Sequence, residues 1–392
     1  MAHAQWVGLL VAALCPLVYV FGTMAAAVRV RRRRPVVRRD ELRISVLKPM
    51  GGLDPGLEQN LESFARLEAH DDFEVICSVA TEEDAAVPVV RRFIAKYPRR
   101  FALVVGANKQ LRNQKMAQLS VALPRARNEL LWISESNVET SQAAMESLLA
   151  TWRDAQRDGR RPTLVHAPLV AVGGTGLGAR FERMHLAAIQ NPIHEVMLVA
   201  GMHLVVGKTE FMHRDDLAAL GGLEAFGDFL GEDYMMGQAF AKRGIVRCAP
   251  EPTRNVLGAL SVQAWFERHV RWAVMRKTIV PWSFVTLEPT MLGFSSVVLA
   301  AFGLVPWSLA LALVALKASL DGVNYWLAAR TPPQLLDLLV APLKELLLAF
   351  AWLKALSTFE VTWRGGATMR LGRNSLVLSR ELRLETEEVG RR

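Results

Sequence analysis

The stretch LLWISESNVET, Leu130 to Thr140, decides the prediction of the fold. It begins as an apolar run and ends in an acid, Glu135, which Ser136 and Asn137 follow. A buried strand that delivers a carboxylate to its C-terminal end is a common way for α/β enzymes to place a metal ligand. Loops of this kind usually carry two aspartates, whereas this one carries one glutamate and an asparagine. The stretch therefore predicts either a metal-binding loop of unusual composition or an ordinary strand end.

Strand-like and helix-like patterns alternate around this stretch. The expected strands are Ile44–Pro49, Phe73–Ala80, Phe101–Gly106 and Glu129–Glu135. The expected helices are Leu57–Leu67, Val87–Tyr97 and Gln114–Leu123. This alternation predicts an α/β fold with a parallel, doubly wound sheet. Ligands of such sheets bind at the C-terminal strand ends, so the acids there are candidate site residues.

Two more groups of acids accompany Glu135. Thr81, Glu82, Glu83 and Asp84 follow the second expected strand, and the segment FLGEDYMMGQAFAKRG places Glu232, Asp233 and Tyr234 ahead of a helix. Each group has a plain structural alternative. The first can be a solvated turn, and acids are also favoured in the first turn of a helix, where they face the positive end of the helix dipole.

A basic helix follows in the segment WFERHVRWAVMRK. Arg268 and Arg271 are three residues apart and share a helix face. Two guanidinium groups present planar donors that match a diphosphate. The alternative is that these arginines bind a membrane surface and that Trp272 belongs to an interfacial aromatic belt.

The composition indicates a membrane-associated chain with a reducing main compartment. The chain has 392 residues, of which 51% are hydrophobic, and a formal net charge of +9. Its three cysteines are far apart, so they form neither a disulfide framework nor a metal cluster. The segment VGGTGLG, Val172 to Gly178, lacks the lysine of a phosphate-binding loop and is expected to be a flexible loop.

The N-terminal segment Trp6–Val28 is uncharged and long enough to span a bilayer. A basic run follows it directly: Arg29, Arg31 to Arg34, Arg38 and Arg39. Charges after the apolar stretch, rather than before it, favour an uncleaved anchor over a signal peptide. Positive charge gathers on the cytoplasmic side, so the following domain is expected there. A nucleic-acid-binding arm is the alternative, but the run directly adjoins an apolar span, and we expect no nucleic acid partner.

Hydrophobic stretches return near the C-terminus. Thr290–Val305 and Trp307–Leu327 are candidate spans separated at Pro306. Leu335–Leu356 holds Lys344 and Glu345 near its centre, where charge is costly, so we expect it to be interfacial or re-entrant. Two crossings would keep the basic tail on the cytoplasmic side; its arginines are Arg364, Arg370, Arg373, Arg380 and Arg383.

These observations predict six regions. They are an N-terminal transmembrane anchor (residues 1–28), a basic juxtamembrane segment (29–40), the α/β domain (41–260), an amphipathic interfacial helix region (261–287), C-terminal membrane segments (288–357) and a basic cytoplasmic tail (358–392).

The motifs, taken in order, resemble those of one enzyme family. SVLKPMGGLDPGLEQNLESF, NQK (Asn113–Lys115), ISESN, GKTEFMHRDDLAALGG, EDY, RHVRW and TWRG occur in this sequence. Any one of them is weak, but together they resemble the GT-A nucleotide-sugar glycosyltransferases. More narrowly, the chain is similar from about Ile44 to Arg364 to the ceramide glucosyltransferase family, glycosyltransferase family 21, with its bacterial ceramide and hopanoid glycosyltransferase relatives.

The resemblance implies a GT-A domain and a set of site residues. Glu83 or Asp84 would contact the nucleotide, Lys115 the phosphates, and Glu135 a divalent cation, Mg²⁺ or Mn²⁺. Asp233, beside Glu232, would deprotonate the acceptor hydroxyl. The helix with Arg268, Arg271 and Trp272 would close over the diphosphate beside the membrane.

The resemblance also implies the reaction, which is an inverting transfer of a hexose, in the first place glucose, from a UDP-sugar to a membrane lipid, in the first place ceramide. A lipid hydroxyl is a poor nucleophile, so a positioned carboxylate base suits this chemistry. The developing charge of a departing UDP suits a metal ion and arginines. The enzyme would be a multi-pass membrane protein with a cytoplasmic catalytic domain, in a bacterial inner membrane rather than the Golgi or endoplasmic reticulum.

Three alternatives stay open at this point. The acceptor can be a hopanoid or another lipid, with N-acetylglucosamine as the sugar. The chain can be a processive polysaccharide synthase, although it is short for a polymer channel. Because the family has aspartates where this chain has Thr81 and Glu135, it can also be a homologue that binds lipid and has lost turnover.

Overall fold

The computed structural model describes residues 2–31, 37–157, 159, 161–291, 293–362 and 368–370. The described chain forms two compact units. The first, here called the sheet unit, comprises Ala27–Gly174 and Met197–Gly258. The second, here called the helical unit, comprises Met1–Ala26, Thr175–Val196 and Ala259–Arg392. The predicted roles of Arg32 to Arg34, Arg364, Arg373, Arg380 and Arg383 fall outside the described residues.

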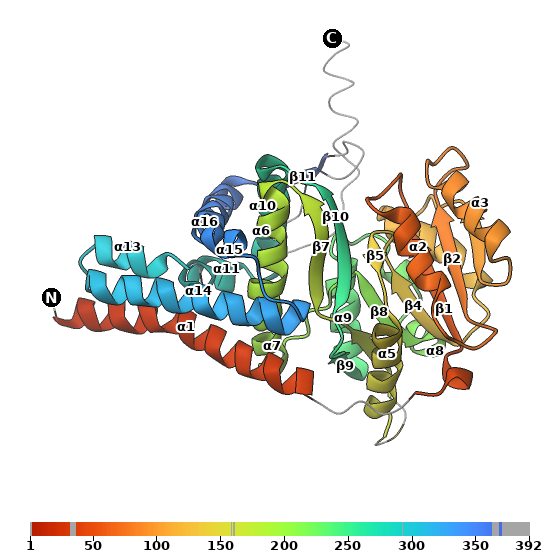
Figure 1. Ribbon diagram of the computed structural model, residues 1–392, viewed down its shortest axis with the longest axis horizontal. Coiled ribbons are helices and arrows are strands. Elements are labelled where there is room, and N and C mark those ends of the chain that lie inside the picture. The colour runs from red at the N-terminus through yellow and green to blue at the C-terminus, as the bar shows by residue number, and fades with distance from the viewer. Residues whose placement is uncertain are drawn as a thin grey trace, which may run out of the picture. The chain divides into compact units, whose positions relative to one another are not determined.

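A seven-stranded sheet with the order β3-β2-β1-β4-β8-β6-β9 organises the sheet unit (Figure 1). Its strands are β1 (Ile44–Pro49), β2 (Glu74–Val79), β3 (Phe101–Val105), β4 (Leu130–Ser134), β6 (Thr163–His166), β8 (Thr209–His213) and β9 (Ile245–Cys248). The first four are parallel, as the alternation of strands and helices predicts. The prediction of a wholly parallel sheet is wrong at β8, which runs antiparallel to both β4 and β6. The molecule is thus a mixed α/β protein.

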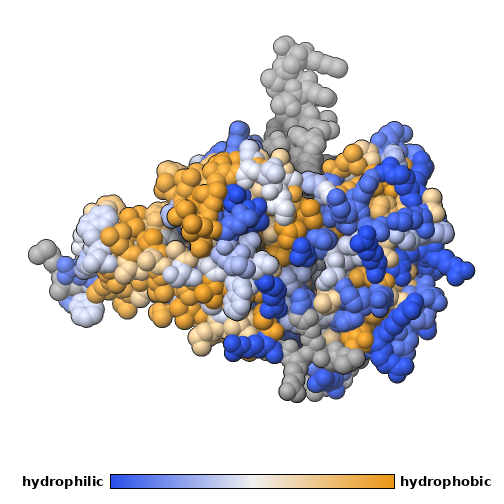
Figure 2. Space-filling view, in the orientation of Figure 1, coloured by the Kyte–Doolittle hydropathy of each residue, from blue (hydrophilic) through white to orange (hydrophobic). Residues whose placement is uncertain are grey.

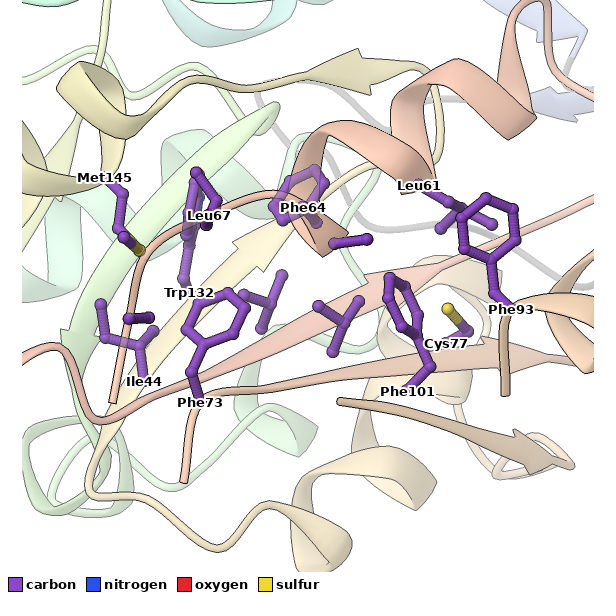
Figure 3. Packing of buried hydrophobic residues seen from close by; sticks show 14 of the residues in the cluster. Ile44, Leu61, Phe64, Leu67, Phe73, Cys77, Phe93, Phe101, Trp132 and Met145 are labelled. Atoms are coloured by element: carbon purple, nitrogen blue, oxygen red, sulfur yellow. The ribbon is translucent and has the colours of Figure 1, made fainter. Parts of the chain in front are cut away.

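Helices cover both faces of this sheet because its strands alternate their buried side chains. On β1, Val46 points into one apolar core with α2 (Leu57–Ala65), α3 (Val87–Lys96) and α5 (Gln142–Ala155). Its neighbour Leu47 points into the opposite core with α4 (Gln114–Ala122) and α9 (Glu232–Arg243). Figure 3 shows the first core, where Phe64 of α2 packs on Trp132 of β4 with ring centroids 5.2 Å apart. The doubly wound prediction is confirmed here.

Smaller elements complete the sheet unit. A second sheet has the order β5-β10-β7, built from β5 (Val138–Glu139), β7 (Leu169–Thr175) and β10 (Thr253–Ala259). The segment Val172 to Gly178, expected to be a flexible loop, therefore contains strand β7 for most of its length. The short helix α8 (Arg214–Ala218) and three 3₁₀ turns (Arg39–Glu41, Leu123–Arg125 and Glu224–Phe226) connect the strands.

The helical unit contains most of α1 (Ala2–Arg31) and the C-terminal helices. They are α6 (Leu177–Met184) with a π-helical continuation (His185–Gln190), α7 (Asn191–Val199), α10 (Val262–Ile279), α11 (Pro281–Thr286), α12 (Glu288–Met291), α13 (Ser295–Ala301), α14 (Trp307–Ala329), α15 (Leu335–Leu339) and α16 (Ala341–Ser357), followed by the hairpin β11 (Glu360–Thr362) and β12 (Thr368–Arg370). Trp265 of α10, Phe181 of α6 and Tyr19 of α1 share its core.

Within the described residues, α1 is the one helix that is long and apolar enough to cross a membrane by length and composition. Within Thr290–Val305 the structure has the helix α13, whose 7 residues extend about 10 Å, and the crossing by this segment stays a prediction. The helix α14 has 23 residues but carries Lys317 and Asp321. The crossing by Trp307–Leu327 stays a prediction.

Exposed apolar side chains gather over α1, α13 and α14 (Figure 2). Leu10 is 72% exposed, Phe302 76% and Leu311 61%. A contiguous apolar surface of this kind marks a contact with a membrane or a partner.

Candidate functional site

A charged site lies in the sheet unit, at the carboxyl ends of β1 and β4 and at the starts of β8 and α9. Its first support is Lys48, which is fully buried at the end of β1. The Lys48 ammonium donates a hydrogen bond of 2.7 Å to the backbone carbonyl of Glu135. Burial lowers the pKa of Lys48 to about 7. Through this hydrogen bond, Lys48 supports the loop that follows β4 from the buried side.

The loop that contains Glu135 contacts Lys208, the residue directly before β8. The Lys208 ammonium forms a short ion pair with the Glu135 carboxylate and donates a hydrogen bond of 3.0 Å to Asn137 Oδ1. The Lys115 ammonium lies 3.7 Å from the other oxygen of the Glu135 carboxylate. Glu135 therefore faces two lysines at this strand end, and its role in a functional site stays a prediction.

Asp84, a predicted nucleotide contact, holds the turn after β1. Its carboxylate accepts hydrogen bonds from the backbone N–H groups of Gly52, at 3.1 Å, and Ala86, at 2.8 Å. The same turn leads to Asp54, whose carboxylate accepts a short hydrogen bond from Ser136 in the loop after β4. Asp84 thus positions backbone that touches the site, whereas Glu83 beside it is exposed.

Lys115 stands at the centre of the site because Asn113 caps the helix α4 that carries it. The Asn113 side chain accepts a hydrogen bond from the backbone of Met116, as an N-cap does. The Lys115 ammonium lies 2.9 Å from Glu232 Oε1 and donates a hydrogen bond of 2.9 Å to the carbonyl of Gly207. Burial alone would lower the pKa of Lys115, but Glu232, followed by Glu210 and Glu135, raises its pKa above the ordinary value. Lys115 is therefore a permanent cation.

Asp233 lies in the first turn of α9 and is half-buried. Its carboxylate accepts hydrogen bonds from the backbone N–H of Gly207, at 2.9 Å, and from its own neighbour Tyr234, at 2.8 Å. Burial, with the charge of Glu232, raises the pKa of Asp233 to about 6. A carboxylate with this pKa is ionised at neutral pH and suited to accept a proton.

Gly207 makes the close approach of these groups possible. A Cβ atom at this position would lie 3.0 Å from the Asp233 carboxylate and 3.0 Å from the Lys115 ammonium. Both distances are tighter than ordinary van der Waals contact. A side chain here would displace the two groups that the site brings together.

Glu210 is a further buried acid of this candidate site, and the sequence reasoning missed it. It lies on β8, is fully buried, and has its nearest cation, Lys115, 3.7 Å away. Among the described residues, neither of its carboxylate oxygens accepts a hydrogen bond. Burial raises the pKa of Glu210 to about 8, so the group is mostly a neutral acid at pH 7.

Lys48 and Lys208 were missed as well. The signal for Lys48 and Glu210 was a charged residue inside an apolar strand pattern, ISVLKP and TEFMH. A charge in such a place is costly unless it is paired, and it therefore marks a site or a buried pair. Lys208 could not be recognised in this way, because it lies just before β8 and not inside an apolar strand pattern.

The predicted diphosphate helix α10 belongs to the helical unit. Arg268 pairs at 2.8 Å with Glu182 of α6, and His269 Nε2 lies 3.0 Å from the same carboxylate. Burial opposes ionisation of Glu182, but His269 and Arg268 keep its pKa below the usual value. Trp272 packs edge-on against His269 at a centroid distance of 5.0 Å, and Arg271 lies one residue away on the same helix. The approach of this helix to Asp233 stays a prediction.

The residues around Glu135 do not fit the divalent cation that the resemblance implies. In the described part of the chain, no three histidine, cysteine, aspartate or glutamate side chains are placed to share a metal ion. The one carboxylate of the loop faces two ammonium groups, and the amide oxygen of Asn137 is taken by Lys208. The role of Glu135 as a metal ligand stays a prediction that this arrangement does not favour.

Curated proteins similar to this chain are ceramide glucosyltransferases. Ceramide glucosyltransferase 1 of Caenorhabditis elegans is 28% identical over 263 residues, which is 67% of this chain and 55% of that protein. Ceramide glucosyltransferase of Komagataella phaffii is 23% identical over 301 residues, 63% of this chain and 59% of that protein. The chain thus spans little more than half the length of the curated relatives it matches.

Similar solved structures are more distant. The mannosyltransferase PcManGT from Pyrobaculum calidifontis, in complex with GDP-Man and Mn²⁺, is 15% identical and has a TM-score of 0.47 over 90% of this chain and 99% of that one. TarS from S. aureus in complex with UDP-GlcNAc is 12% identical, with a TM-score of 0.40 over 86% of this chain and 99% of that one. At these TM-scores the likeness carries no conclusion about the ligands of this chain.

A family model covers nearly the whole sequence. The model of glycosyl transferase family 21 matches residues 8–377, from within α1 to beyond the last described strand. The match includes both halves of the sheet unit and the helices that follow them. The chain belongs to glycosyl transferase family 21.

Proposed function

We propose that this chain is an inverting membrane glycosyltransferase of the GT-A type, which transfers a hexose, in the first place glucose, from a UDP-sugar to the hydroxyl of a membrane lipid, in the first place ceramide. Its family and the names of its curated relatives support the activity and the lipid acceptor. The observation that carries the proposal is the carboxylate of Asp233, which is half-buried, is held by two backbone N–H groups and lies with the Lys115 ammonium against Gly207.

In the proposed reaction, Asp233 accepts the proton of the lipid hydroxyl. The hydroxyl oxygen forms a bond to the anomeric carbon, and the bond from that carbon to the phosphate oxygen breaks on the opposite side. UDP leaves with the bonding electrons, and the sugar carbon is inverted. The raised pKa of Asp233, about 6, makes the carboxylate a better base than an exposed aspartate while leaving it ionised at pH 7.

The other predicted residues have supporting roles in this proposal. The Asn113 side-chain amide donates a hydrogen bond of 3.1 Å to the Glu232 carboxylate. The same carboxylate forms an ion pair with the Lys115 ammonium. Lys115 places positive charge where a departing diphosphate needs it. Glu83, which is exposed, or Asp84 would contact the nucleotide, and Asp84 also holds the turn after β1. Arg268, Arg271 and Trp272 of α10 would add donors on the membrane side.

The proposed location is a membrane, with the sheet unit on the cytoplasmic side. The helix α1 is the anchor, and the apolar surface of α13 and α14 supports further contact with lipid. Arg29, near the end of α1, donates hydrogen bonds to the carbonyls of Ala249, at 3.2 Å, and Pro250, at 3.3 Å, which are contacts within the sheet unit. We place the protein in a bacterial inner membrane as a multi-pass protein.

The test uses membranes that contain the full chain, labelled UDP-glucose or UDP-N-acetylglucosamine, and ceramide or a total lipid extract. We expect labelled lipid with the wild type and a loss of about 10²–10⁴-fold in rate with Asp233→Asn, since the base is removed. The control Asp71→Asn changes an exposed aspartate of the same unit and should retain the rate.

The products separate the remaining alternatives. A lipid that carries N-acetylglucosamine, or a labelled lipid that is not ceramide, would change the donor or the acceptor and keep the class of reaction. A polymeric product would indicate a synthase. An Asp233→Asn rate equal to that of the wild type would exclude Asp233 as the base, and folded protein without transfer to any lipid of its own membrane would indicate the impaired homologue.

A further inference from the structure

The resemblance implies a metal ion at the loop after β4. In the structure, the ammonium of Lys208, which precedes β8, contacts this loop instead. The Lys208 ammonium contacts two of the loop's three polar residues, the Glu135 carboxylate and the Asn137 amide oxygen. We propose that Lys208, with Lys115, takes the place of the divalent cation, so that this protein binds the diphosphate of its donor through ammonium groups and without a metal. This inference rests on the proposed function, because it concerns the same donor.

The sequence and the structure point to this exchange independently. In the sequence, the loop has one carboxylate where two are usual, since Asn137 replaces the second. A hard cation such as Mg²⁺ or Mn²⁺ prefers several oxygen ligands, and carboxylates attract it most strongly. In the structure, the remaining carboxylate already has two ammonium neighbours, Lys208 and Lys115. A dication added beside the same carboxylate would be repelled by both.

The Lys208 ammonium is held firmly enough to act as a fixed charge. In the chain, Lys208 precedes Thr209, which is buried. The Thr209 hydroxyl lies 2.8 Å from the hydroxyl of Thr253 on the second sheet. Lys208 follows Gly207, which is bound on both sides, through its N–H to Asp233 and through its carbonyl to Lys115. The backbone that carries Lys208 is therefore fixed to three elements of the sheet unit.

Among the described residues, two of the three donors of this ammonium have partners, which leaves the third for a ligand. A lysine ammonium has three N–H donors, and the contacts to Glu135 and Asn137 use two of them. The Lys208 side chain is 23% exposed, so the side chain is only partly covered by the protein. A lysine is a common phosphate ligand and acts as a point charge, as a metal ion does.

In this proposal, the two lysines that replace the metal ion differ in burial and in the carboxylates that balance them. Lys115 is more deeply buried, with its side chain 14% exposed, and is balanced by Glu232 beside Asp233. Lys208 is nearer to solvent and is balanced by the loop after β4. Together they present positive charge to a diphosphate from two sides of Gly207. No covalent step changes, because only the counter-charge of the leaving UDP differs.

The experiment measures UDP binding to the purified full chain in detergent by isothermal titration, once in EDTA and once in excess Mn²⁺. The variants are Lys208→Met, Lys208→Arg and the control Lys242→Met, which removes an exposed lysine of α9 in the same unit. Thermal unfolding of each variant is recorded, so that a loss of folding is separated from a loss of binding.

We expect the wild type and Lys242→Met to bind UDP with the same affinity, within about twofold, in EDTA and in Mn²⁺. We expect Lys208→Met to bind about 10-fold to 100-fold more weakly in EDTA, because a charge-assisted contact is lost. Lys208→Arg keeps the positive charge and should retain binding in EDTA. If Lys208→Met fails to fold, the EDTA comparison in the wild type and in Lys208→Arg still decides the question.

Other results would overturn the inference in distinguishable ways. UDP binding by the wild type that needs Mn²⁺ would show that a metal acts at the site and would leave the proposed function intact. Equal binding in EDTA by Lys208→Met and the wild type would show that Lys208 is only a structural ion pair. No UDP binding under any condition, from folded protein, would remove the proposed nucleotide donor and this inference with it.

Discussion

Two clusters of buried charged side chains, one in each unit, use similar residues in different ways. The helical cluster consists of Lys317, Asp321, Lys344 and Glu345. Lys317 pairs with Asp321, Lys344 lies 2.9 Å from Glu345, and Lys317 lies 3.7 Å from Glu345. No side chain of the four is more than 8% exposed. Two ammonium groups face two carboxylates, so the cluster is closed and balanced.

The sheet cluster consists of Lys115, Lys208, Glu135, Glu210, Glu232 and Asp233. It is open, since the side chains of Glu135 and Lys208 are 30% and 23% exposed. It is also unbalanced, because among the described residues Glu210 accepts no hydrogen bond and Asp233 accepts hydrogen bonds from backbone N–H groups alone. Closure and balance are typical of a structural cluster, whereas accessible and imperfectly paired charges are typical of a binding site. From this comparison we infer that the helical cluster stabilises the fold and that the sheet cluster is the candidate for binding and chemistry.

The largest expected effect is on stability and comes from removing one cation of the helical cluster. Lys344→Met should lower the free energy of unfolding by about 3–5 kcal/mol, because a buried carboxylate, Glu345, loses a cation. Lys354→Met, at an exposed position of the same helix, should cost less than about 0.5 kcal/mol. Thermal unfolding in detergent compares the two. Equal stability of the two variants would contradict the structural role of the cluster.

The next prediction concerns the neutral acid of the sheet cluster. The pKa of Glu210 in the folded protein, about 8, is above its value in an unfolded chain, 4.5. The folded wild type therefore holds an extra proton between these values and loses stability as the pH rises from 4.5 to 8.

Glu210→Gln removes this pH dependence. Its stability relative to the wild type should rise between pH 5 and pH 8 by about 3–4 kcal/mol, since the folded wild type holds its extra proton over most of this range. Thermal unfolding at the two pH values measures the change. The control Glu146→Gln, at a half-buried position of α5, should show no such trend, and a constant difference for Glu210→Gln would show that Glu210 is ionised in the folded protein.

A smaller effect separates the geometry of the sheet cluster from its charge. Gly207→Ala should lower the rate of transfer by about 10-fold to 100-fold, because the new Cβ displaces Asp233 and Lys115 by a few tenths of an ångström. Stability should change less than activity. Gly322→Ala on α14, where a Cβ meets only Leu338 at 3.6 Å, should leave the rate unchanged. An unchanged rate with Gly207→Ala would show that the site tolerates the shift.

The smallest effect follows the ionisation of Asp233. Because its pKa is about 6 and its carboxylate is the active form, kcat/KM should fall about tenfold between pH 7 and pH 5. The rate profile of the wild type measures this fall, with thermal unfolding over the same range as a control for folding. A profile that stays flat down to pH 5 would mean that Asp233 is not the base or that its pKa is ordinary.

The local pattern of the sequence was sufficient for the first half of the sheet unit. The expected strand Ile44–Pro49 has the observed bounds, and the second to fourth strands agree within two residues. These strands are strongly apolar and are separated by amphipathic helices, so their identity depends on neighbours in the chain. The positions of Asp233 at a helix start and of Glu135 at a strand end follow from the same local pattern.

Partners that come from distant segments could not be predicted. Lys208 meets Glu135 from 73 residues away, and Arg268 meets Glu182 from 86 residues away. The antiparallel direction of β8 has the same origin, since a strand's alternation shows which face is buried but not which way it runs. Electrostatic pairing depends on distance in space, to which composition and spacing give no access.

By itself, the sequence determined the alternation of strands and helices, the apolar N-terminal helix and the acids at the strand ends, because each depends on residues close together in the chain. Only the tertiary structure decided which charges meet. It placed Lys208 on the loop of Glu135, buried Glu210 without a full partner, and brought Gly207 close enough to hold Asp233 and Lys115 together. The physical reason is that a charge changes its role with its neighbours and its burial, and both are set by the packing of the whole sheet.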